Sequence, residues 1–168
     1  MIHVCSLADL QDTVKHTGAS HVLTVMANVA QVQRPATVLE ANHLRVQMDD
    51  ITEPTEGFVA PNEAHVARVL EFVRRWDRSA PLVVHCYAGI SRSTASAFAA
   101  VCMLNPQRDE RDIARLIRAA SPIASPNRLL VSLADRALGR DGRMVRALDE
   151  MGPGSMTVAG RPFRLDLE

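Results

Sequence analysis

The segment from Pro81 to Asn105 constrains the fold of this chain more than any other. It begins with PLVVHC, a run apolar enough to form a strand that is buried on both faces of a sheet. A short turn that contains a glycine follows, and the next run, STASAFAAVCMLN, is apolar almost all round. A helix without a polar face is itself buried. The segment therefore predicts a buried strand, a tight turn and a buried helix in direct succession.

The rest of the chain predicts strands that alternate with helices, followed by a run of helices. Short apolar or alternating runs favour strands, and apolar residues at helical spacing favour amphipathic helices. Ser6 and Asn62 are suitable N-caps, and Gly18 is a suitable helix stop. Strands are predicted at residues 2–5, 21–26 and 43–48, helices at 6–18, 62–76, 109–121, 127–138 and 142–151, and a loop or weak segment at 27–40. This order predicts an α/β fold with a central, mainly parallel sheet flanked by helices and a helical C-terminal half.

A chain of 168 residues fits one domain, or one domain and a tail. We expect a single domain over residues 1–151. Residues 152–168 contain glycine and proline early and show no clear period, so this tail is expected to wander or to lie on the surface.

The charge pattern argues against broad electrostatic binding to nucleic acid or to a membrane, because the formal net charge is zero. Residues 1–84 carry a charge of −3 and residues 85–168 a charge of +3, so the second half favours an anion. We expect no membrane partner, because the chain has neither a signal-peptide pattern nor an apolar run of membrane-spanning length. The three cysteines show no CxxC or metal-ligand spacing, which predicts reduced thiols, a cytoplasmic location, and neither a metal nor a cofactor.

The turn inside the first segment has the composition of an anion site. A helix N-terminus presents unpaired N–H groups and a positive dipole. Gly89 lets the turn curl so that several N–H groups point inward, and the small Ala88 keeps its mouth open. Arg92 adds a planar fork of donors that matches two phosphate oxygens. The same positive field favours the thiolate of Cys86 over the thiol.

The run HCYAGISRS resembles the signature H-C-x5-R-S/T of the cysteine-dependent protein tyrosine and dual-specificity phosphatases. Two weaker matches extend the resemblance to residues 1–138. DDITEP stands some 35 residues upstream, where these enzymes carry a mobile loop with a general-acid aspartate, and SPN at 125–127 precedes apolar residues as in compact members. The short chain resembles the compact, dual-specificity-like type.

The resemblance implies a role for each matched residue. Cys86 attacks phosphorus and forms a phosphocysteine intermediate. Ser93 hydrogen-bonds its sulfur and helps it to leave. His85 orients the loop and tunes the thiolate; the alternative is a histidine that only satisfies backbone groups. Arg92 holds the equatorial oxygens together with the amides of Tyr87, Ala88, Gly89, Ile90, Ser91 and Arg92 itself.

The resemblance places a general acid in the acidic loop, but the sequence leaves the residue open. Asp50 is favoured, because Pro54 stands four residues after it and family members often carry a proline or small turn at about that distance. Asp49, Glu53 and Glu56 are the alternatives. All four also fit a solvated acidic turn.

The remaining polar and sulfur-containing residues are expected to be structural. His43 and His65 are predicted to lie on the surface or on a helix face. Cys5 and Cys102 are predicted to be core thiols, and Trp76 is predicted to pack against the end of a helix.

The resemblance implies a phosphomonoesterase that acts on phosphotyrosine, with phosphoserine and phosphothreonine as further candidates. Its partners are a phosphorylated protein or a small phosphomonoester, and inhibitory oxyanions such as phosphate or vanadate. A loop interior without lysine makes phosphoinositides less favoured substrates. The alternatives are a binding module that captures phosphate esters without turnover, and sulfur or arsenate chemistry on a similar loop.

Overall fold

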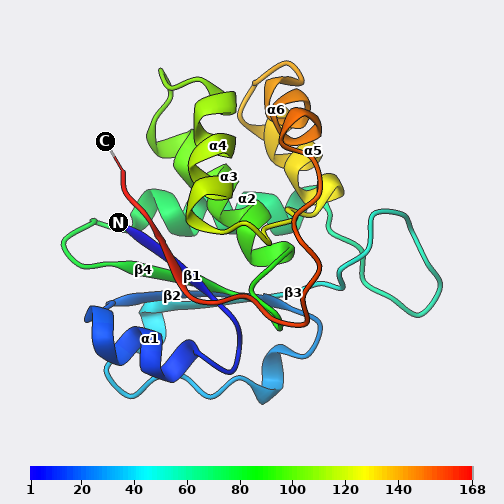
Figure 1. Ribbon diagram of the computed structural model, residues 1–168. Coiled ribbons are helices and arrows are strands. Elements are labelled where there is room, and N and C mark those ends of the chain that lie inside the picture. The colour runs from blue at the N-terminus through cyan, green and yellow to red at the C-terminus, as the bar shows by residue number, and fades with distance from the viewer. Residues whose placement is uncertain (168) are drawn as a thin grey trace.

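A five-stranded sheet forms the centre of the computed structural model, which describes residues 1–167 (Figure 1). The spatial order is β3-β2-β4-β1-β5. The first four strands in the chain pair in parallel, and the last is antiparallel to β1. The mainly parallel sheet is therefore confirmed. The strands are β1 (Ile2–Cys5), β2 (His21–Met26), β3 (His43–Gln47), β4 (Leu82–His85) and β5 (Phe163–Leu165).

Helices cover both faces of the sheet. In Figure 1, α1 lies below the sheet and the later helices form a thick layer above it. The helical C-terminal half is as predicted, and the segment after β2 holds only two short 3-10 helices, Val29–Gln31 and Glu40–Asn42. The α-helices are α1 (Leu10–Thr17), α2 (Glu63–Arg75), α3 (Arg92–Leu104), α4 (Glu110–Ala120), α5 (Arg128–Ala137) and α6 (Arg143–Met151).

The buried strand and helix predicted at the centre are β4 and α3. Leu82 and Val84 belong to the large core beneath α2, α3 and α5, whereas Val83 belongs to the smaller core on the α1 side. Alternate residues of β4 thus pack against opposite layers. Every residue of α3 from Arg92 to Cys102 is buried. Trp76 is also buried, as expected, and its indole N–H donates to the Ala80 carbonyl over 2.9 Å.

The helix ends agree with the sequence except at the start of α1. Asn62 caps α2 by accepting the N–H of His65 over 3.0 Å, and Gly18 ends α1 with a φ of 67°. Ser6 does not cap α1, which begins only at Leu10. The Ser6 hydroxyl instead accepts the N–H of Asp9 over 3.2 Å and donates to its carboxylate over 2.7 Å. A local turn has replaced the first helical turn, as serine side chains often allow.

The expectation of a wandering C-terminal tail is wrong for residues 163–165, which form β5 alongside β1. Phe163 and Leu165 are buried in the large core and Arg164 between them is exposed. Without β5, the edge of β1 would present unpaired backbone groups. Three residues are too few to show a period of two in the sequence, so only the open edge reveals this strand. The expected tail ends at Glu168, which lies outside the described residues.

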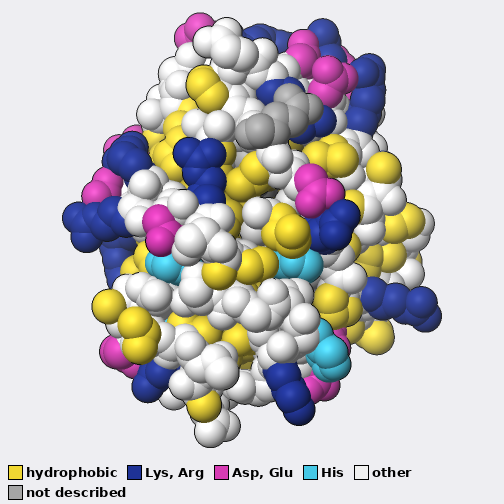
Figure 2. Space-filling model, turned by 90° about the vertical axis from the view of Figure 1, so that its left-hand side faces the viewer, with side chains coloured by type: hydrophobic (Ala, Val, Ile, Leu, Met, Phe, Trp, Pro, Cys, Tyr) yellow, Lys and Arg dark blue, Asp and Glu magenta, His cyan; other side chains and the backbone are white. Residues whose placement is uncertain are grey.

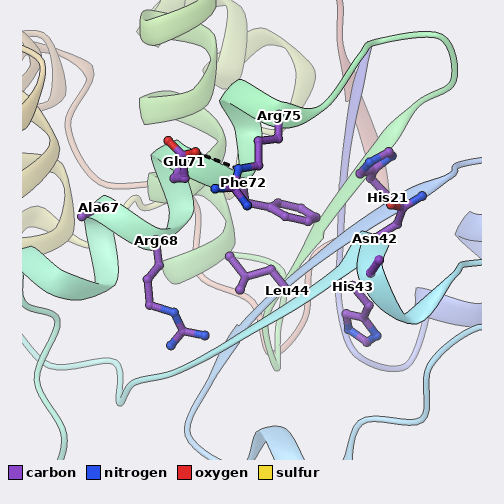
Figure 3. A pocket seen from close by; sticks show the side chains of 10 residues that line it. His21, Asn42, His43, Leu44, Ala67, Arg68, Glu71, Phe72 and Arg75 are labelled. Atoms are coloured by element: carbon purple, nitrogen blue, oxygen red, sulfur yellow. Dashed lines mark hydrogen bonds and ion pairs between the residues drawn. The ribbon is translucent and has the colours of Figure 1, made fainter.

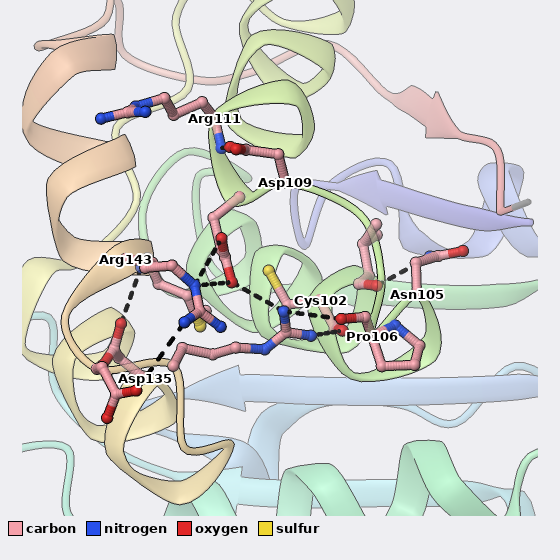
Figure 4. Close-up of polar contacts among 12 residues, drawn as sticks. Cys102, Asn105, Pro106, Asp109, Arg111, Asp135 and Arg143 are labelled. Atoms are coloured by element: carbon pink, nitrogen blue, oxygen red, sulfur yellow. Dashed lines mark hydrogen bonds and ion pairs between the residues drawn. The ribbon is translucent and has the colours of Figure 1, made fainter.

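A buried ion-pair cluster joins α4 to the turn before α6 (Figure 4). Arg140 donates to the Glu110 carboxylate over 2.8 Å and to the carbonyl of Cys102 over 2.5 Å. The side chains of Glu110 and Arg140 are 4% and 7% exposed. Arg143 donates to the same carboxylate over 3.1 Å, and Asp135 accepts the N–H of Met144 over 2.8 Å at the start of α6. The exposed ion pairs elsewhere belong to a surface on which acidic and basic side chains are interspersed, as Figure 2 shows for one face.

We predict that Glu110→Ala destabilises the fold by about 3–5 kcal/mol, because it leaves the Arg140 guanidinium buried without its counterion. Urea unfolding monitored by the fluorescence of Trp76, the only tryptophan, measures this free energy. Glu150→Ala is the matched control, since its pair with Arg111 is about half exposed on both sides and is worth no more than ~1 kcal/mol. Equal effects of the two variants would contradict this account of the cluster.

Candidate active site

The predicted anion loop lies at the carboxyl end of the central strand β4 and leads directly into α3. We call residues 86–92 the signature loop. Ser91 stands at the N-cap of α3, but its hydroxyl does not cap the helix. It donates instead to the carboxylate of Asp50 over 2.7 Å. The first turn of α3 therefore keeps its N–H groups without a side-chain cap, which suits an anion.

Groups from outside hold the carbonyl oxygens of the signature loop. Because a trans peptide places C=O and N–H on opposite sides, carbonyls bound from outside turn the N–H groups of the same peptides toward the centre of the loop. The donors come from the end of β1, from the α4–α5 connection, from the C-terminal segment and from His85. The pairs are His85 Nδ1 with Cys86 O (3.3 Å), Leu7 N with Tyr87 O (3.1 Å), Gly160 N with Ala88 O (2.7 Å), Ser125 N with Ile90 O (3.0 Å) and Asn127 N with Ser91 O (3.3 Å).

Gly89 is required by the packing of the loop. Its φ is 72°, a left-handed backbone conformation that residues other than glycine rarely adopt. A Cβ atom at this position would lie 2.8 Å from the backbone of both Cys5 and Ser6. The sequence analysis explained Gly89 by the curvature of the turn. The close approach to the end of β1 is a second reason for a glycine at this position.

The Cys86 sulfur lies at the floor of the loop and is nearly enclosed, with the residue 2% exposed. Its Sγ atom is 3.1 Å from Ser93 Oγ, and it accepts the N–H of Gly89 over 3.3 Å. Hydrogen bonds to sulfur favour its charged form. The predicted contact between Cys86 and Ser93 is therefore present in the structure.

Arg92 turns its guanidinium from the start of α3 toward the end of β3. Its Nη1 donates to the carbonyl of Met48 over 2.9 Å. Its Nε is buried and has no hydrogen-bond partner among residues 1–167. A buried donor without a partner costs about 1–3 kcal/mol, more for a charged group. An oxyanion in the signature loop would provide the missing acceptor.

The structure separates Asp50, which the sequence favours as the acid, from its alternative Asp49. Asp49 closes its own loop: its N–H donates to Val59 O and its carboxylate accepts the Val59 N–H, both over 2.7 Å. Asp50 faces the signature loop, where its Oδ1 accepts from Ser91 Oγ and, over 2.8 Å, from Asn127 Nδ2. Glu53 and Glu56 are exposed in the same acidic loop.

Asn127 is the residue at this site that sequence reasoning missed. Its Nδ2 donates to Asp50 and, over 3.2 Å, to Ile51 O, while its Oδ1 accepts the N–H of Leu130 over 3.0 Å and caps α5. Its backbone N–H donates to Ser91 O over 3.3 Å, so this one residue connects the acidic loop, the signature loop and α5. The only signal was SPN, whose asparagine is also an ordinary helix cap.

The prediction that His43 lies on the surface is wrong: this residue is buried and belongs to a chain of hydrogen bonds behind the signature loop. Thr24 Oγ1 lies 2.8 Å from His43 Nε2 and 2.6 Å from His85 Nε2. His43 opens β3 beside β2, and its ring reaches the neighbouring Thr24 on the same face of the sheet. His65 is half-buried on α2, as expected.

The positions of the hydrogen atoms in the hydrogen bonds of His43, Thr24 and His85 follow from the acceptors and donors that each group faces. His85 Nδ1 faces the carbonyl of Cys86 and must donate, so His85 Nε2 accepts from the hydroxyl of Thr24. A hydroxyl has one hydrogen, so Thr24 Oγ1 in turn accepts from His43 Nε2. Burial lowers the pKa of both histidines to about 4. Both rings are therefore neutral at pH 7, and His85 supports the loop without adding charge.

Two hollows differ in their relation to this site. A polar hollow of about 460 Å³ lies beside the signature loop and is lined by Asp50, Ser91 and Asn127 among others. A larger hollow of about 630 Å³ lies between α2 and the edge of β3, where Figure 3 shows the Phe72 ring and the Leu44 side chain near one another. The larger hollow contains no residue of the signature loop, so size alone does not identify the candidate site.

A mainly parallel sheet whose central strand leads into a tight turn with a cysteine and an arginine is the arrangement of the cysteine-based phosphatases. The protein-tyrosine phosphatase family model matches residues 12–123, and the chain belongs to this family, within the superfamily that also holds the dual-specificity phosphatases. No curated protein sequence matches the chain. No helix in the described part of the chain is long and apolar enough to cross a membrane.

Solved structures share this fold at low sequence identity. DUSP15 has 22% identity and a TM-score of 0.66, over 92% of this chain and 94% of its own. Human DUSP28 has 20% identity and a TM-score of 0.61, over 83% and 88%. PTPMT1 in complex with PI(5)P has 16% identity and a TM-score of 0.60, over 84% and 94%. These likenesses confirm the α/β fold expected from the sequence.

We predict that stability falls between pH 6.5 and pH 4 because His43 and His85 are buried in their neutral form. A histidine in the unfolded chain has a pKa near 6.5, whereas burial lowers the pKa of His85 in the folded chain to about 4. The unfolded chain then binds more protons, so stability is fully present above pH 6.5 and is lost as the pH falls. For His85 the loss is about 1.4 kcal/mol per pH unit in this window.

Urea unfolding at pH 7, 6 and 5, with Trp76 fluorescence as the signal, measures the effect. His85→Asn removes the most deeply buried of these rings and reduces the slope against pH. The same slope in the wild type and in His85→Asn would contradict the assignment.

Proposed function

We propose that this protein hydrolyses phosphomonoesters through a phosphocysteine intermediate, with phosphotyrosine as the main substrate and phosphoserine and phosphothreonine as further ones. One observation carries the proposal: the Cys86 sulfur lies on the floor of a loop whose N–H groups turn inward, beside a buried arginine with an unpaired donor. This arrangement matches a tetrahedral dianion and aims a nucleophile at its centre.

In the first step, the Cys86 thiolate forms a bond to phosphorus and the ester oxygen leaves. Asp50 gives its proton to that oxygen as the bond breaks. The inward N–H groups from Tyr87 to Arg92 and the guanidinium of Arg92 hold the equatorial oxygens, whose charge they stabilise. The ester is thereby converted to an alcohol or phenol and a phosphocysteine.

In the second step, water attacks the phosphocysteine. Asp50, now a carboxylate, takes a proton from the water, and the sulfur leaves as a thiolate. Ser93 stabilises that leaving thiolate through its contact at 3.1 Å. Inorganic phosphate then departs and the enzyme regains its starting state. Every proton and electron pair is supplied by these residues and water, so we expect EDTA to leave the rate unchanged.

Asp50 is our choice for the acid because its carboxylate reaches the signature loop while Asp49 is engaged with Val59. Ser91 and Asn127 hold Asp50 in place before substrate arrives. His85 has a positioning role, since it donates to the carbonyl of Cys86 and is neutral.

Two of the alternatives also involve phosphate esters. A binding module without turnover would lack one of the reactive groups, but Cys86, Arg92 and Asp50 are all present. A phosphoinositide phosphatase is the other alternative, and the PI(5)P bound to PTPMT1 keeps it in the test. The loop interior of Tyr87, Ala88 and Ile90 offers no lysine to a polyphosphorylated headgroup. We also propose a cytoplasmic location and no nucleic-acid or membrane partner.

We predict that Cys86→Ser abolishes hydrolysis of para-nitrophenyl phosphate and of phosphotyrosine peptides while vanadate still binds. A serine hydroxyl is far less ionised than the thiol at neutral pH, but the loop amides and Arg92 remain. Released phosphate measures turnover, and isothermal calorimetry measures vanadate binding. Cys102→Ala, which alters a buried thiol of α3, is the control and should retain turnover. Turnover by Cys86→Ser would refute the mechanism, and a preference for phosphoinositides would refute the substrate.

We predict that Asp50→Asn lowers kcat for a phosphotyrosine peptide by about 100-fold or more and removes the alkaline limb of the pH profile. The loss should be smaller for para-nitrophenyl phosphate, whose leaving group needs less protonation. Asp49→Asn is the matched control, because its amide oxygen still accepts the N–H of Val59. If Asp49→Asn causes the loss and Asp50→Asn does not, the acid has been assigned to the wrong residue.

A further inference from the structure

The C-terminal segment between α6 and β5 runs along the outside of the site. We call residues 152–162 the C-terminal strap. In Figure 1 it is the red-orange chain that descends from α6 past the helical layer to the sheet. Gly154 N donates to Ser125 Oγ over 2.9 Å, Ser155 N to Pro122 O over 3.1 Å, and Gly160 N to Ala88 O over 2.7 Å.

The glycines of the C-terminal strap allow these contacts. A Cβ atom on Gly154 would lie 2.3 Å from the carbonyl oxygen of Ile123. A Cβ atom on Gly160 would lie 3.0 Å from the carbonyl oxygen of Gly89 and 3.1 Å from Ile123 Cδ1. At both positions the backbone of the strap lies so close to a neighbouring backbone that a residue with a Cβ atom would clash or be crowded. Gly160 is buried against the outside of the signature loop.

The contact of Gly160 reaches the nucleophile through a single peptide group. The Ala88 carbonyl and the Gly89 N–H belong to the same peptide. Its oxygen accepts from Gly160 N over 2.7 Å, and its N–H donates to Cys86 Sγ over 3.3 Å. A hydrogen bond on the carbonyl polarises the amide and strengthens its N–H as a donor, by about 10–30% per bond in condensed phase.

This peptide differs from its neighbours in the loop. Within residues 1–167, Gly89 provides the one backbone N–H that donates to the Cys86 sulfur. The carbonyls of Tyr87, Ile90 and Ser91 are held by Leu7, Ser125 and Asn127, which support other parts of the loop. The orientation of the donor on the sulfur thus depends on the C-terminal strap.

We propose that the C-terminal strap is a positioning element for the nucleophile: Gly160 holds the Ala88–Gly89 peptide so that the Gly89 N–H stabilises the Cys86 thiolate. Gly160 is a positioning residue, because it acts through this peptide and touches neither sulfur nor substrate. The proposal rests on the proposed function for its catalytic consequence, but the acidity of the thiol can be measured without any turnover.

The test uses Gly160→Pro in the full chain, since proline has no N–H to donate. The rate of alkylation of Cys86 by iodoacetamide is measured against pH by mass spectrometry, with Cys86→Ser as the blank. Burial raises the pKa of Cys5 and of Cys102 to about 12, so neither thiol competes below pH 9. We expect the midpoint to rise by about half a pH unit or more, which lowers the thiolate fraction below the midpoint about threefold.

Two further variants separate positioning from loss of folding. Ala159→Pro makes the same substitution one residue earlier, at an N–H that makes no hydrogen bond within the described chain, and should leave the midpoint unchanged. Gly160→Ala keeps the N–H but displaces it through its Cβ, and should give a smaller rise than Gly160→Pro. If Gly160→Pro fails to fold, Gly160→Ala decides the question.

A midpoint within about 0.1 pH unit of the wild type in a folded Gly160→Pro, or in Gly160→Ala when proline prevents folding, would overturn the proposal. A rise as large in Ala159→Pro would overturn it as well, because the effect would then come from general loosening. If the wild type hydrolyses no phosphomonoester, the proposed function fails, whereas the alkylation midpoints still show whether the strap controls the thiol.

Discussion

The site depends on one constraint, which is that the carbonyl oxygens of the signature loop must be bound from outside. Residues 86–91 precede α3 and lie outside the regular helices and strands, so among their carbonyls only that of Ser91 accepts a helical N–H, from Ala95 over 2.9 Å. Leu7, Ser125, Asn127 and Gly160 supply the missing donors from three separate segments of the chain. Because these donors hold the carbonyls outward, the N–H groups of the same peptides are left for an anion and for the Cys86 sulfur.

The charge of the site depends on which of its buried side chains are charged and which are neutral. Arg92 remains charged in a buried position and keeps a donor without a partner among residues 1–167, which suits an oxyanion. His43 and His85 are buried as neutral rings, because desolvation lowers the pKa of both to about 4. The hydrogen bonds through Thr24 thus fix the orientation of the neutral His85 ring. Arg92 is then the cation of the signature loop.

Sequence reasoning succeeded where a local pattern carried the information. The run from Leu82 to Cys86 and the apolar helix after it identify β4, α3 and the turn between them, because burial on all sides leaves few other places for them. Reasoning failed where a residue serves several segments at once. Asn127 reads as a helix cap, His43 as a surface residue, and residues 163–165 are too few to show a strand. Each has a role that depends on a distant neighbour.

A local pattern in the sequence is enough to identify the groups of the proposed reaction: a cysteine and an arginine six positions apart, a glycine between them, and a strand and helix that fix them in the interior. The tertiary structure alone decided which aspartate faces the loop, which segments hold its carbonyls, and that the chain's last strand closes the sheet beside its first. The physical reason is the range of the interactions. Secondary structure and the composition of a tight turn depend on neighbours within a few residues, whereas hydrogen bonds such as those of Gly160 and Asn127 join segments that meet only after folding.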